Sequence, residues 1–521
     1  MAPADSKAEL AGLPSQALVG AVPQLLLPNL AAMLAVVTLA YCLFVSGGTE
    51  QLFRDSDSGW HIRTGEWILA HRALPSSDLY SFSKAGQAWF LWEWGSDVLM
   101  GLAHRLDGLR GVAALFGLVI FACTWLCVRL QLAVGGDFFL SALLTAPIVT
   151  TASLHWLARP HVFSWVFLLI TVWYAEQGRP RWRHLLLIFA FTALWANIHA
   201  SFFLAPAIAL VYAASHAIRP LLWQLDAVKE RANARWYLLA ALAGFAGSFV
   251  NPYGWRLHAH IFAYLRAEDL TARVAEFQSF NFHTKGAVQI MLVVGLGAAG
   301  AIVALMQKKV AHFLLASAFL WEGLRSARML PVVALAILPL ANGALSEALR
   351  GVESLRPPLQ RALHCAFRYS SRLRRIDQGI HGWGFAACAM LLLLLALKVP
   401  ALAAGIGFPS SRFPVQAATA VERLPANAHI VAPDSYGGYL IYRFDGARKV
   451  YFDGRSDFYG VPFMKQYLTL TSVQPGWRDV MRSYGFTHAL LPRNSALKAA
   501  LDDAGWVTLY SDEVATLQEA P

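Results

Sequence analysis

Charged residues are scarce in this chain: 14% of its 521 residues are Asp, Glu, Lys or Arg, whereas 57% are hydrophobic. A soluble globular protein carries roughly 25% charged residues, so this shortage excludes an ordinary soluble fold. Cysteine is scarce too, with four of the five residues in apolar runs and one in a basic loop. Their spacing predicts neither a disulfide framework nor a zinc site. Long apolar runs dominate instead, which indicates a protein that crosses a membrane several times.

The apolar runs are long enough to span a bilayer, because a membrane helix needs about 20 predominantly apolar residues and sometimes as few as about 17. The first run lacks a cleavage site of the A-x-A type, so we expect an uncleaved signal anchor after a disordered N-terminus, residues 1–24. We therefore predict a mainly α protein, with a polytopic transmembrane helix bundle in residues 25–404. The predicted spans, about eleven in number, are 25–47, 111–130, 138–157, 161–177, 184–199, 201–217, 236–251, 285–306, 309–324, 327–346 and 380–404.

Four basic loops predict the orientation of this bundle, because short loops rich in Lys and Arg stay in the cytoplasm. These loops are 178–183, 219–235, 308–309 and 350–375. All four are cytoplasmic if the N-terminus is cytoplasmic, which supports both the spans and the orientation. Much of the net charge of +11 lies in such loops and forms no basic stripe on a soluble domain, so it does not indicate nucleic-acid binding.

Two segments on the opposite, outer side are more than connections. The first outer loop, 47–110, contains a short amphipathic run that ends at Pro75, and its Trp residues are typical of helices that lie in the membrane interface. The tail, 405–521, alternates strand-like and helix-like runs, which predicts βαβ units with a parallel sheet in a small soluble extracytoplasmic α/β domain. This tail has no Cys and no glycine-rich phosphate loop of the Rossmann or Walker type.

Two carboxylates, Asp55 and Asp57, follow the first span almost directly, in the sequence RDSDSGWH. Two carboxylates this close can share a cation, or one can act as a base whose pKa the other raises. They can equally cap the helix that follows, where Asp and Ser are common. Metal binding stays open as well, because such a pair can hold a divalent ion, Mg²⁺ or Mn²⁺, or work without one.

Arginine and histidine side chains fall in short turns on the same predicted side. Arg159 and His161 share one turn, where Arg159 either anchors its helix at the membrane edge or binds a phosphate in bidentate fashion. His199 is either a structural histidine or, with His161 and the Asp pair, completes a metal site. Arg325 and Arg328 are three residues apart, so we expect them on one helix face. The positive-inside rule disfavours Arg on the outer side, so these two cations indicate an anionic ligand such as a lipid phosphate.

These motifs together resemble the GT-C superfamily of membrane glycosyltransferases, which take a sugar from a polyprenyl-phosphate carrier at the outer membrane face. More narrowly, the chain resembles a bacterial family of uncharacterised GT-C-like proteins. It departs from the family pattern at Gly59, where relatives commonly show a second Trp. The matching pieces, which extend over nearly the whole chain, are DSDSGWHIRTGEWI, LPSSDLYSFS, WEW, LARPHVFS, WANIHASF, NPYGW, EFQSF, YGGYLIYRF, VYFDGRSDFYG and THALLPR.

The resemblance implies a catalytic Asp in the first outer loop, which corresponds to Asp55 or Asp57. It implies a place in the bacterial cytoplasmic membrane and three partners: a polyprenyl-phosphate sugar donor, the lipid bilayer, and an acceptor glycan, lipid or protein. The predicted donor-phosphate ligands are Arg159, His161, His199, Arg325 and Arg328. The predicted substrate-binding residues are Trp60, His61, Arg63, Glu93 and Asn197.

The expected reaction is a single displacement with inversion, in which an Asp is the general base and cations stabilise the departing phosphate. Two other classes stay open. A transporter or flippase of a lipid-linked sugar would carry inverted repeats and helices broken at mid-depth, and no repeat is obvious in the sequence. A non-catalytic assembly protein would bind a partner through its outer domain and would not need the Asp pair.

Overall fold

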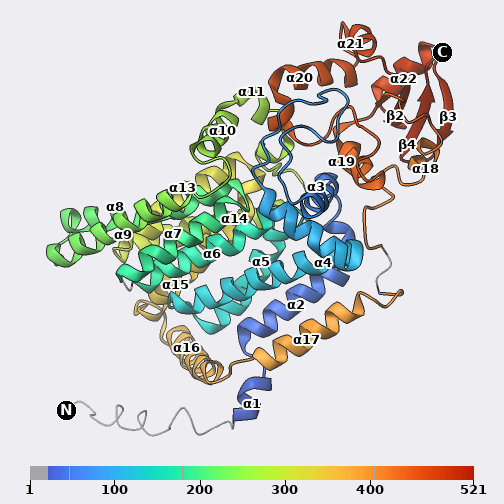
Figure 1. Cartoon of the computed structure of the whole chain (residues 1–521). Coiled ribbons are helices and arrows are strands. Elements are labelled where there is room, and N and C mark those ends of the chain that lie inside the picture. Colours follow the sequence, from blue (N-terminus) through green and yellow to red (C-terminus); the bar gives the residue numbers. More distant parts are fainter. Residues whose placement is uncertain (1–20, 46, 179–180, 285, 403–404) are drawn as a thin grey trace, which may run out of the picture.

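The computed structural model describes residues 21–45, 47–178, 181–284, 286–402 and 405–521, and within them the chain is mainly helical, as predicted (Figure 1). The helices before the C-terminal domain are α1 (Ala21–Leu26), α2 (Leu30–Phe44), α3 (Asp57–His71), α4 (Trp94–Ala133), α5 (Phe138–Ala152), α6 (His161–Gln177), α7 (Trp182–Ala196), α8 (Leu204–Leu222), α9 (Ala227–Gly247), α10 (Trp255–Arg266), α11 (Glu268–Thr271), α12 (Ala287–Met306), α13 (Val310–Arg325), α14 (Leu330–Val332), α15 (Leu338–Arg350), α16 (Pro357–Gln378) and α17 (Trp383–Ala396).

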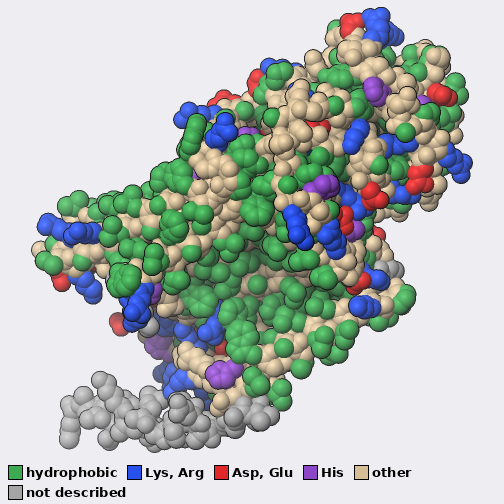
Figure 2. Space-filling view, in the orientation of Figure 1, with side chains coloured by type: hydrophobic (Ala, Val, Ile, Leu, Met, Phe, Trp, Pro, Cys, Tyr) green, Lys and Arg blue, Asp and Glu red, His purple; other side chains and the backbone are tan. Residues whose placement is uncertain are grey.

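Every predicted span overlaps a helix. Six helices in the described residues are long and apolar enough to cross a membrane, or seven if the bent pair of α16 and α17 is one span. Apolar side chains cover the middle of the bundle, and Lys and Arg gather toward its ends (Figure 2). The chain is a multi-pass membrane protein. Its exact number of spans and its orientation stay predictions, as does the disorder of residues 1–20, which lie outside the described residues.

The first outer loop contributes two helical pieces to the outer end of the bundle. The amphipathic run predicted there forms α3, which ends at Arg72 in the left-handed conformation, three residues before Pro75. α4 is broken at Asp107 and Gly108, where the backbone leaves helical geometry. The part of α4 before this break packs beside α3, and the apolar part after it coincides with the predicted second span.

α16 differs from the loop predicted for residues 350–375. Residues Pro357–Gln378 form a 22-residue helix that is bent by 79° from α17. Two prolines in its first turn suit a helix start, and no further Pro or Gly interrupts the run. Its arginines are spread over an otherwise amphipathic sequence, and a basic amphipathic helix can lie in the membrane interface. The prediction of a loop is therefore wrong for residues Pro357–Gln378, because these basic residues continue a helical run.

The C-terminal domain has a four-stranded sheet in the order β1-β2-β4-β3. β1 and β2 pair in parallel, whereas β4 pairs antiparallel with both β2 and β3. The prediction of a parallel sheet is therefore wrong for most of this sheet, because β3 and β4 follow each other through a tight turn and form a hairpin. The elements are α18 (Ala417–Val421), β1 (Ile430–Val431), α19 (Asp434–Arg443), α20 (Ser456–Thr471), α21 (Trp477–Tyr484), β2 (His488–Pro492), α22 (Ala496–Asp503), β3 (Val507–Ser511) and β4 (Ala515–Glu519).

The C-terminal domain packs directly on α3 through its helix α19 (Figure 1). A Cβ added at Gly59 would overlap the carbonyl oxygen of Gly438, and one added at Gly438 would overlap the carbonyl oxygen of Ser56. The buried Arg455 adds an ion pair to Asp78 of the first outer loop, at 2.8 Å. A Trp at position 59 would push the two helices apart, so the departure from the family pattern at Gly59 follows from this contact.

Candidate functional site

Arg159 is the centre of the site, and its guanidinium pairs with three carboxylates. Its Nη1 lies 2.9 Å from Asp55 Oδ2 and 3.0 Å from Glu276 Oε1, and its Nη2 lies 3.0 Å from Asp57 Oδ2. The turn that carries Arg159 is fixed to the first outer loop, because the backbone N–H of Ala158 donates to a carbonyl oxygen there at 2.8 Å. The structure thus brings together side chains that are about 100 to 220 positions apart in the chain.

Asp55 combines the two roles between which the sequence left a choice. Its Oδ1 accepts the backbone N–H of Asp57 at 2.9 Å, which closes the turn that begins α3, while its Oδ2 faces Arg159. The helix-start role and the charged role are therefore compatible. The side chain of Asp55 is 22% exposed and that of Asp57 is 8% exposed, so Asp55 is the carboxylate that a substrate reaches more easily.

Asp57 is enclosed by the C-terminal domain. A Cβ added at Gly454 would overlap the Asp57 carboxylate, which therefore lies directly against the backbone of this loop. Burial raises the pKa of Asp57 to about 8, because the pull of Arg159 does not offset burial and the repulsion of Asp55, Asp453 and a third carboxylate. In this arrangement Asp57 is largely protonated at neutral pH.

Glu276 connects Arg159 to a second cation. It lies on the segment between α11 and α12, and its Oε2 is 3.6 Å from the Nη1 of Arg328. Its backbone carbonyl also accepts from the hydroxyl of Ser326 at 3.0 Å. Burial alone would raise the pKa of Glu276, but Arg159 and Arg328 outweigh burial and lower it to about 2. This segment is therefore held over the Asp pair by charge.

A second polar cluster lies beside the first, around His61 of α3. Its Nδ1 is 2.5 Å from Asp97 Oδ1 at the start of α4, and its Nε2 is 4.0 Å from Glu93. Glu93 also lies 3.4 Å from the Nε2 of His199. Burial lowers the pKa of His61 well below its usual value and raises that of Glu93 to about 7. The His61 ring is therefore neutral and shares a hydrogen bond with Asp97, whose pKa burial also raises, and Glu93 gains or loses a proton near physiological pH.

Arg325 is not brought into either cluster. It ends α13 with a side chain that is 66% exposed and lies 3.8 Å from Glu322. The chain leaves the helix at Ser326, and Arg328 follows in a 3₁₀ turn. The prediction that Arg325 and Arg328 share one helix face is therefore wrong, because they do not belong to one helix.

The other predicted ligands lie in contacts that hold the outer end together. His161 Nε2 is 3.1 Å from a backbone carbonyl, and the Asn197 side chain accepts from an indole N–H of α4 at 2.9 Å. Trp60 is buried, with its ring centroid 3.6 Å from that of His61. Arg63 donates to a carboxylate one turn along α3 at 2.6 Å and to a carbonyl of α19. A role for His161 in binding the donor phosphate, and for the other three residues in binding the substrate, stays a prediction.

No group of three or more His, Cys, Asp or Glu side chains in the described residues has the arrangement of a metal site. Between Asp55 and Asp57, the guanidinium of Arg159 lies where a divalent ion would bridge the pair. The side chains as arranged here therefore do not fit a bound Mg²⁺ or Mn²⁺ ion. The metal ion stays a prediction that no contact in this structure supports.

Three residues of the site, Glu276, Asp97 and Gly454, are not identified by strong signals in the sequence. Glu276 belongs to the EFQSF motif, which was the available signal, but the motif does not reveal what its carboxylate contacts. Asp97 stands in the first turn of a helix, where an acid is common without any other role. Gly454 lies in a polar loop whose Gly and Asp are explained by turn chemistry. Their proximity to His61 and Asp57 comes from tertiary contacts alone.

Comparison with solved structures identifies the fold of the chain. The chain has the GT-C fold of membrane glycosyltransferases, so the resemblance recognised in the sequence is confirmed at the level of the fold. The oligosaccharyltransferase of Archaeoglobus fulgidus, tethered with an acceptor peptide containing the NVT sequon, matches with a TM-score of 0.56 and 11% identity over 89% of this chain and 68% of that one. The same organism's AglB, in complex with an inhibitory peptide and a dolichol-phosphate, matches with a TM-score of 0.54 and 11% identity over 89% and 69% of the two chains.

A further solved structure is similar over most of both chains. ArnT from Cupriavidus metallidurans, bound to undecaprenyl phosphate, aligns over 94% of this chain and 97% of its own, with 14% identity and a TM-score of 0.47. No protein-family model matches the chain, and no curated protein matches it in sequence. At these identities the comparisons establish the fold and leave the reaction to be argued from the site.

Proposed function

We propose that this chain is an inverting membrane glycosyltransferase that moves a sugar from a polyprenyl-phosphate-linked donor to an acceptor at the outer face of the bacterial cytoplasmic membrane. The observation that carries the proposal is the partly exposed Asp55 beside Arg159, in the turn that begins α3, the helix on which the C-terminal domain packs. The dolichol-phosphate in the AglB complex supports a lipid phosphate as part of the donor. A base and a cation next to each other are what transfer from a phosphate leaving group requires.

Asp55 is the general base of the proposed reaction. The acceptor hydroxyl attacks the anomeric carbon while Asp55 takes its proton. The bond between that carbon and the phosphate oxygen breaks, and the polyprenyl phosphate leaves with the bonding electrons. A single displacement of this kind inverts the anomeric centre. In the proposed reaction Asp57 acts as a hydrogen-bond donor: its protonated carboxyl donates to an oxygen of Asp55 or of the substrate.

Arg159 and Arg328 are the proposed ligands of the departing phosphate, and Glu276 occupies the space between them in this structure. The donor phosphate replaces the Glu276 carboxylate, since both are anions that suit the same two guanidinium groups. The Nε2 of His199 lies 3.4 Å from Glu93 in the neighbouring cluster, and this histidine can donate to the phosphate. Arg325 has no part in this proposal, because its side chain is largely exposed and its ion pair is with Glu322 on the same helix.

The test is an assay of donor cleavage on the full-length protein in lipid nanodiscs. The protein is incubated with a panel of synthetic undecaprenyl-phosphate sugars and detergent-solubilised envelope lipids as acceptors, and released undecaprenyl phosphate is measured by mass spectrometry. We expect Asp55→Asn to lower release by about 10²- to 10⁴-fold, the usual cost of losing a general base. Asp107→Asn is a matched control, because Asp107 is a 34%-exposed carboxylate at the break in α4 that pairs with Arg110 at 3.2 Å.

Two outcomes decide against the proposal. Unchanged release by both Asp55→Asn and Asp57→Asn would remove the catalytic role from the Asp pair and favour an assembly protein. Movement of the lipid-linked sugar across the bilayer without cleavage would identify a flippase. Binding is measured separately with undecaprenyl phosphate alone, where Arg328→Gln should weaken retention while Asp107→Asn should not.

A further inference from the structure

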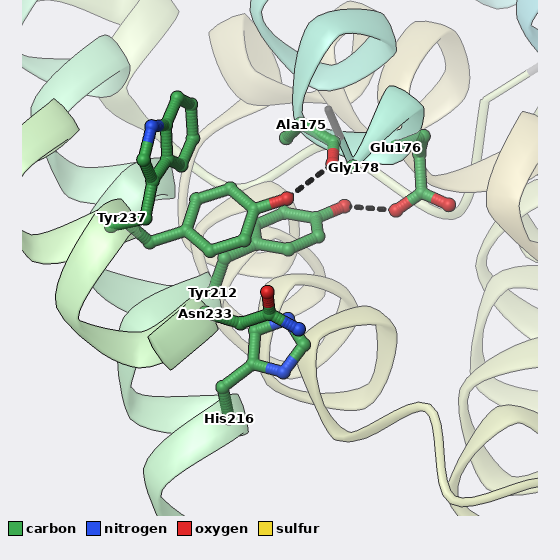
Figure 3. Close-up of a pocket in the computed structure, with 8 residues that line it drawn as sticks. Ala175, Glu176, Gly178, Tyr212, His216, Asn233 and Tyr237 are labelled. Carbon is green, nitrogen blue, oxygen red and sulfur yellow. Dashed lines mark hydrogen bonds between the residues drawn. The ribbon is translucent and has the colours of Figure 1, made fainter. Parts of the chain in front are cut away.

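A second polar site lies at the opposite end of the bundle from Arg159. α6 begins at His161, beside Arg159, and its 17 residues extend for about 25 Å at 1.5 Å per residue, with Glu176 near the far end. A cavity of about 210 Å³ opens there between α6, α8 and α9 (Figure 3). Its polar and aromatic lining consists of Glu176, Tyr212, His216, Asn233, Trp236 and Tyr237.

Glu176 is the carboxylate of this cavity that lacks a permanent cation. Its Oε1 accepts from the hydroxyl of Tyr212 and from the Nε2 of His312, which is 2.9 Å away. The neighbouring Glu230, in contrast, pairs with Arg219 at 3.0 Å. Among the described residues, no Lys or Arg forms an ion pair with Glu176. An ionisable residue in a membrane-spanning helix is costly and usually marks a binding site or an ion path.

Aromatic rings form the walls of the cavity. The ring centroid of Tyr237 lies 5.2 Å from that of Tyr212, 5.5 Å from that of His216 and 5.1 Å from that of Trp236. Figure 3 shows the two tyrosine hydroxyls directed toward the end of α6, one bonded to the Glu176 carboxylate and the other to a backbone carbonyl. The buried indole N–H of Trp236 has no hydrogen-bond partner among the described residues.

We propose that this cavity binds an ammonium group, with Glu176 as its counter-ion and the rings of Tyr212, Trp236 and Tyr237 around it. A carboxylate within an aromatic wall is the arrangement that recognises organic cations, because the faces of the rings carry negative charge. Gly178 also lines the cavity, and the exposed Arg181 and Arg183 follow it within five residues of the chain, so they suit a phosphate near the ammonium. The ligand is therefore a phosphoethanolamine-type group, carried by a membrane lipid or by a soluble amine. This inference does not depend on the proposed glycosyl transfer.

The experiment counts retained lipids by native mass spectrometry. The full-length protein is reconstituted in nanodiscs of phosphatidylglycerol with a minor fraction of phosphatidylethanolamine, and the lipids that remain bound after transfer to detergent are identified. We expect the wild type to retain phosphatidylethanolamine, and Glu176→Gln to reduce that retention roughly tenfold or more, as loss of the charge partner in an aromatic site implies. Glu347→Gln is the matched control, because Glu347 is a 57%-exposed glutamate near the same end, paired with Lys309 at 2.7 Å.

The arms of the experiment separate the two sources of the amine. Displacement by added O-phosphoethanolamine supports a soluble amine as ligand, and resistance to displacement supports the lipid headgroup. Equal retention of phosphatidylethanolamine by the wild type and a folded Glu176→Gln protein overturns the proposal, as does a preference for a neutral glycolipid. If Glu176→Gln does not fold, Trp236→Leu must release the lipid and Tyr237→Phe must keep it. Retention by Trp236→Leu at the wild-type level overturns the proposal in that case.

Discussion

At the scale of single residues, the site depends on a balance of charge around Arg159. Its guanidinium meets Asp55, Asp57 and Glu276 at 2.9–3.0 Å, and Arg328 contacts the last of these. Three ionised carboxylates would exceed two guanidinium charges. Because burial raises the pKa of Asp57 to about 8, this carboxyl is mostly neutral at pH 7, and the two remaining carboxylates match the two arginines.

Replacement of Arg159 is expected to weaken the protein as well as its activity. Arg159→Ala leaves three carboxylates without their shared partner and should destabilise the fold by about 2 kcal/mol or more, below the roughly 3–5 kcal/mol of a fully buried pair, because the side chain is 18% exposed. The stability of Arg159→Lys should lie between those of the wild type and Arg159→Ala, since one ammonium cannot reproduce the bidentate contact of a guanidinium. The unfolding temperature in detergent is the measurement, and equal values for Arg159→Ala and the wild type would contradict this account.

Asp57 gives the stability of the protein a definite pH dependence. Its pKa is about 8 in the folded chain and roughly 3.9 in an unfolded one, so the folded state binds the proton more tightly. The proton bound to Asp57 therefore adds to the free energy of unfolding. This stabilisation is fully present below the pKa of the unfolded chain and is lost as pH rises through about 8. Asp57→Asn resembles the protonated form and removes the titration. The unfolding temperature of Asp57→Asn minus that of the wild type should therefore increase from about pH 5 to about pH 8 and then level off; a flat difference would refute the assignment.

At the scale of elements, the junction of α3 with the C-terminal domain decides the shape of the site. Gly59 and Gly438 allow α3 and α19 to approach closely, and Gly454 lies against the carboxylate of Asp57. The domain therefore forms one wall of the site and fixes a carboxylate in it. The buried Arg455, paired with Asp78, holds this wall to the first outer loop.

Gly454→Ala tests this wall. The added methyl overlaps the Asp57 carboxylate, so we expect a loss of about 1–3 kcal/mol, typical of an overpacked site, together with slower donor cleavage because Asp57 is displaced. Gly295→Ala in α12 is the control, since a Cβ there meets no atom within 4 Å and alanine favours a helix. Unfolding temperature and donor cleavage are measured for both proteins. Wild-type behaviour of Gly454→Ala would show that the domain does not position Asp57.

At the scale of the whole molecule, the two polar sites lie at opposite ends of one apolar bundle. The Asp pair and the C-terminal domain share one end, and the cavity around Glu176 lies at the other. The positive-inside rule assigns the second end to the cytoplasm, because the basic loops and α16 belong to it. The orientation of the chain therefore decides which site meets which compartment.

The native cysteines offer a direct test of this orientation. Cys365 is exposed on α16, whereas Cys42, Cys123 and Cys127 are buried and Cys388 lies in the apolar helix α17. A membrane-impermeant maleimide should label Cys365 in inverted vesicles and leave it unlabelled in right-side-out vesicles. A Cys365→Ser protein provides the background. Labelling of Cys365 from the periplasmic side would reverse the predicted topology and place the Asp pair in the cytoplasm.

The sequence by itself determined the membrane class, the positions of the helices and the acidic first outer loop. These follow from the length of apolar runs and from local spacing, which a one-dimensional pattern records. Only the tertiary structure decided which side chains meet: that Asp55 and Asp57 share Arg159 with Glu276, that His61 pairs with Asp97, and that β4 pairs antiparallel with its neighbours. Such pairings join distant parts of the chain, and they depend on how whole elements pack. The same holds for Arg325, which a break at the end of α13 separated from Arg328.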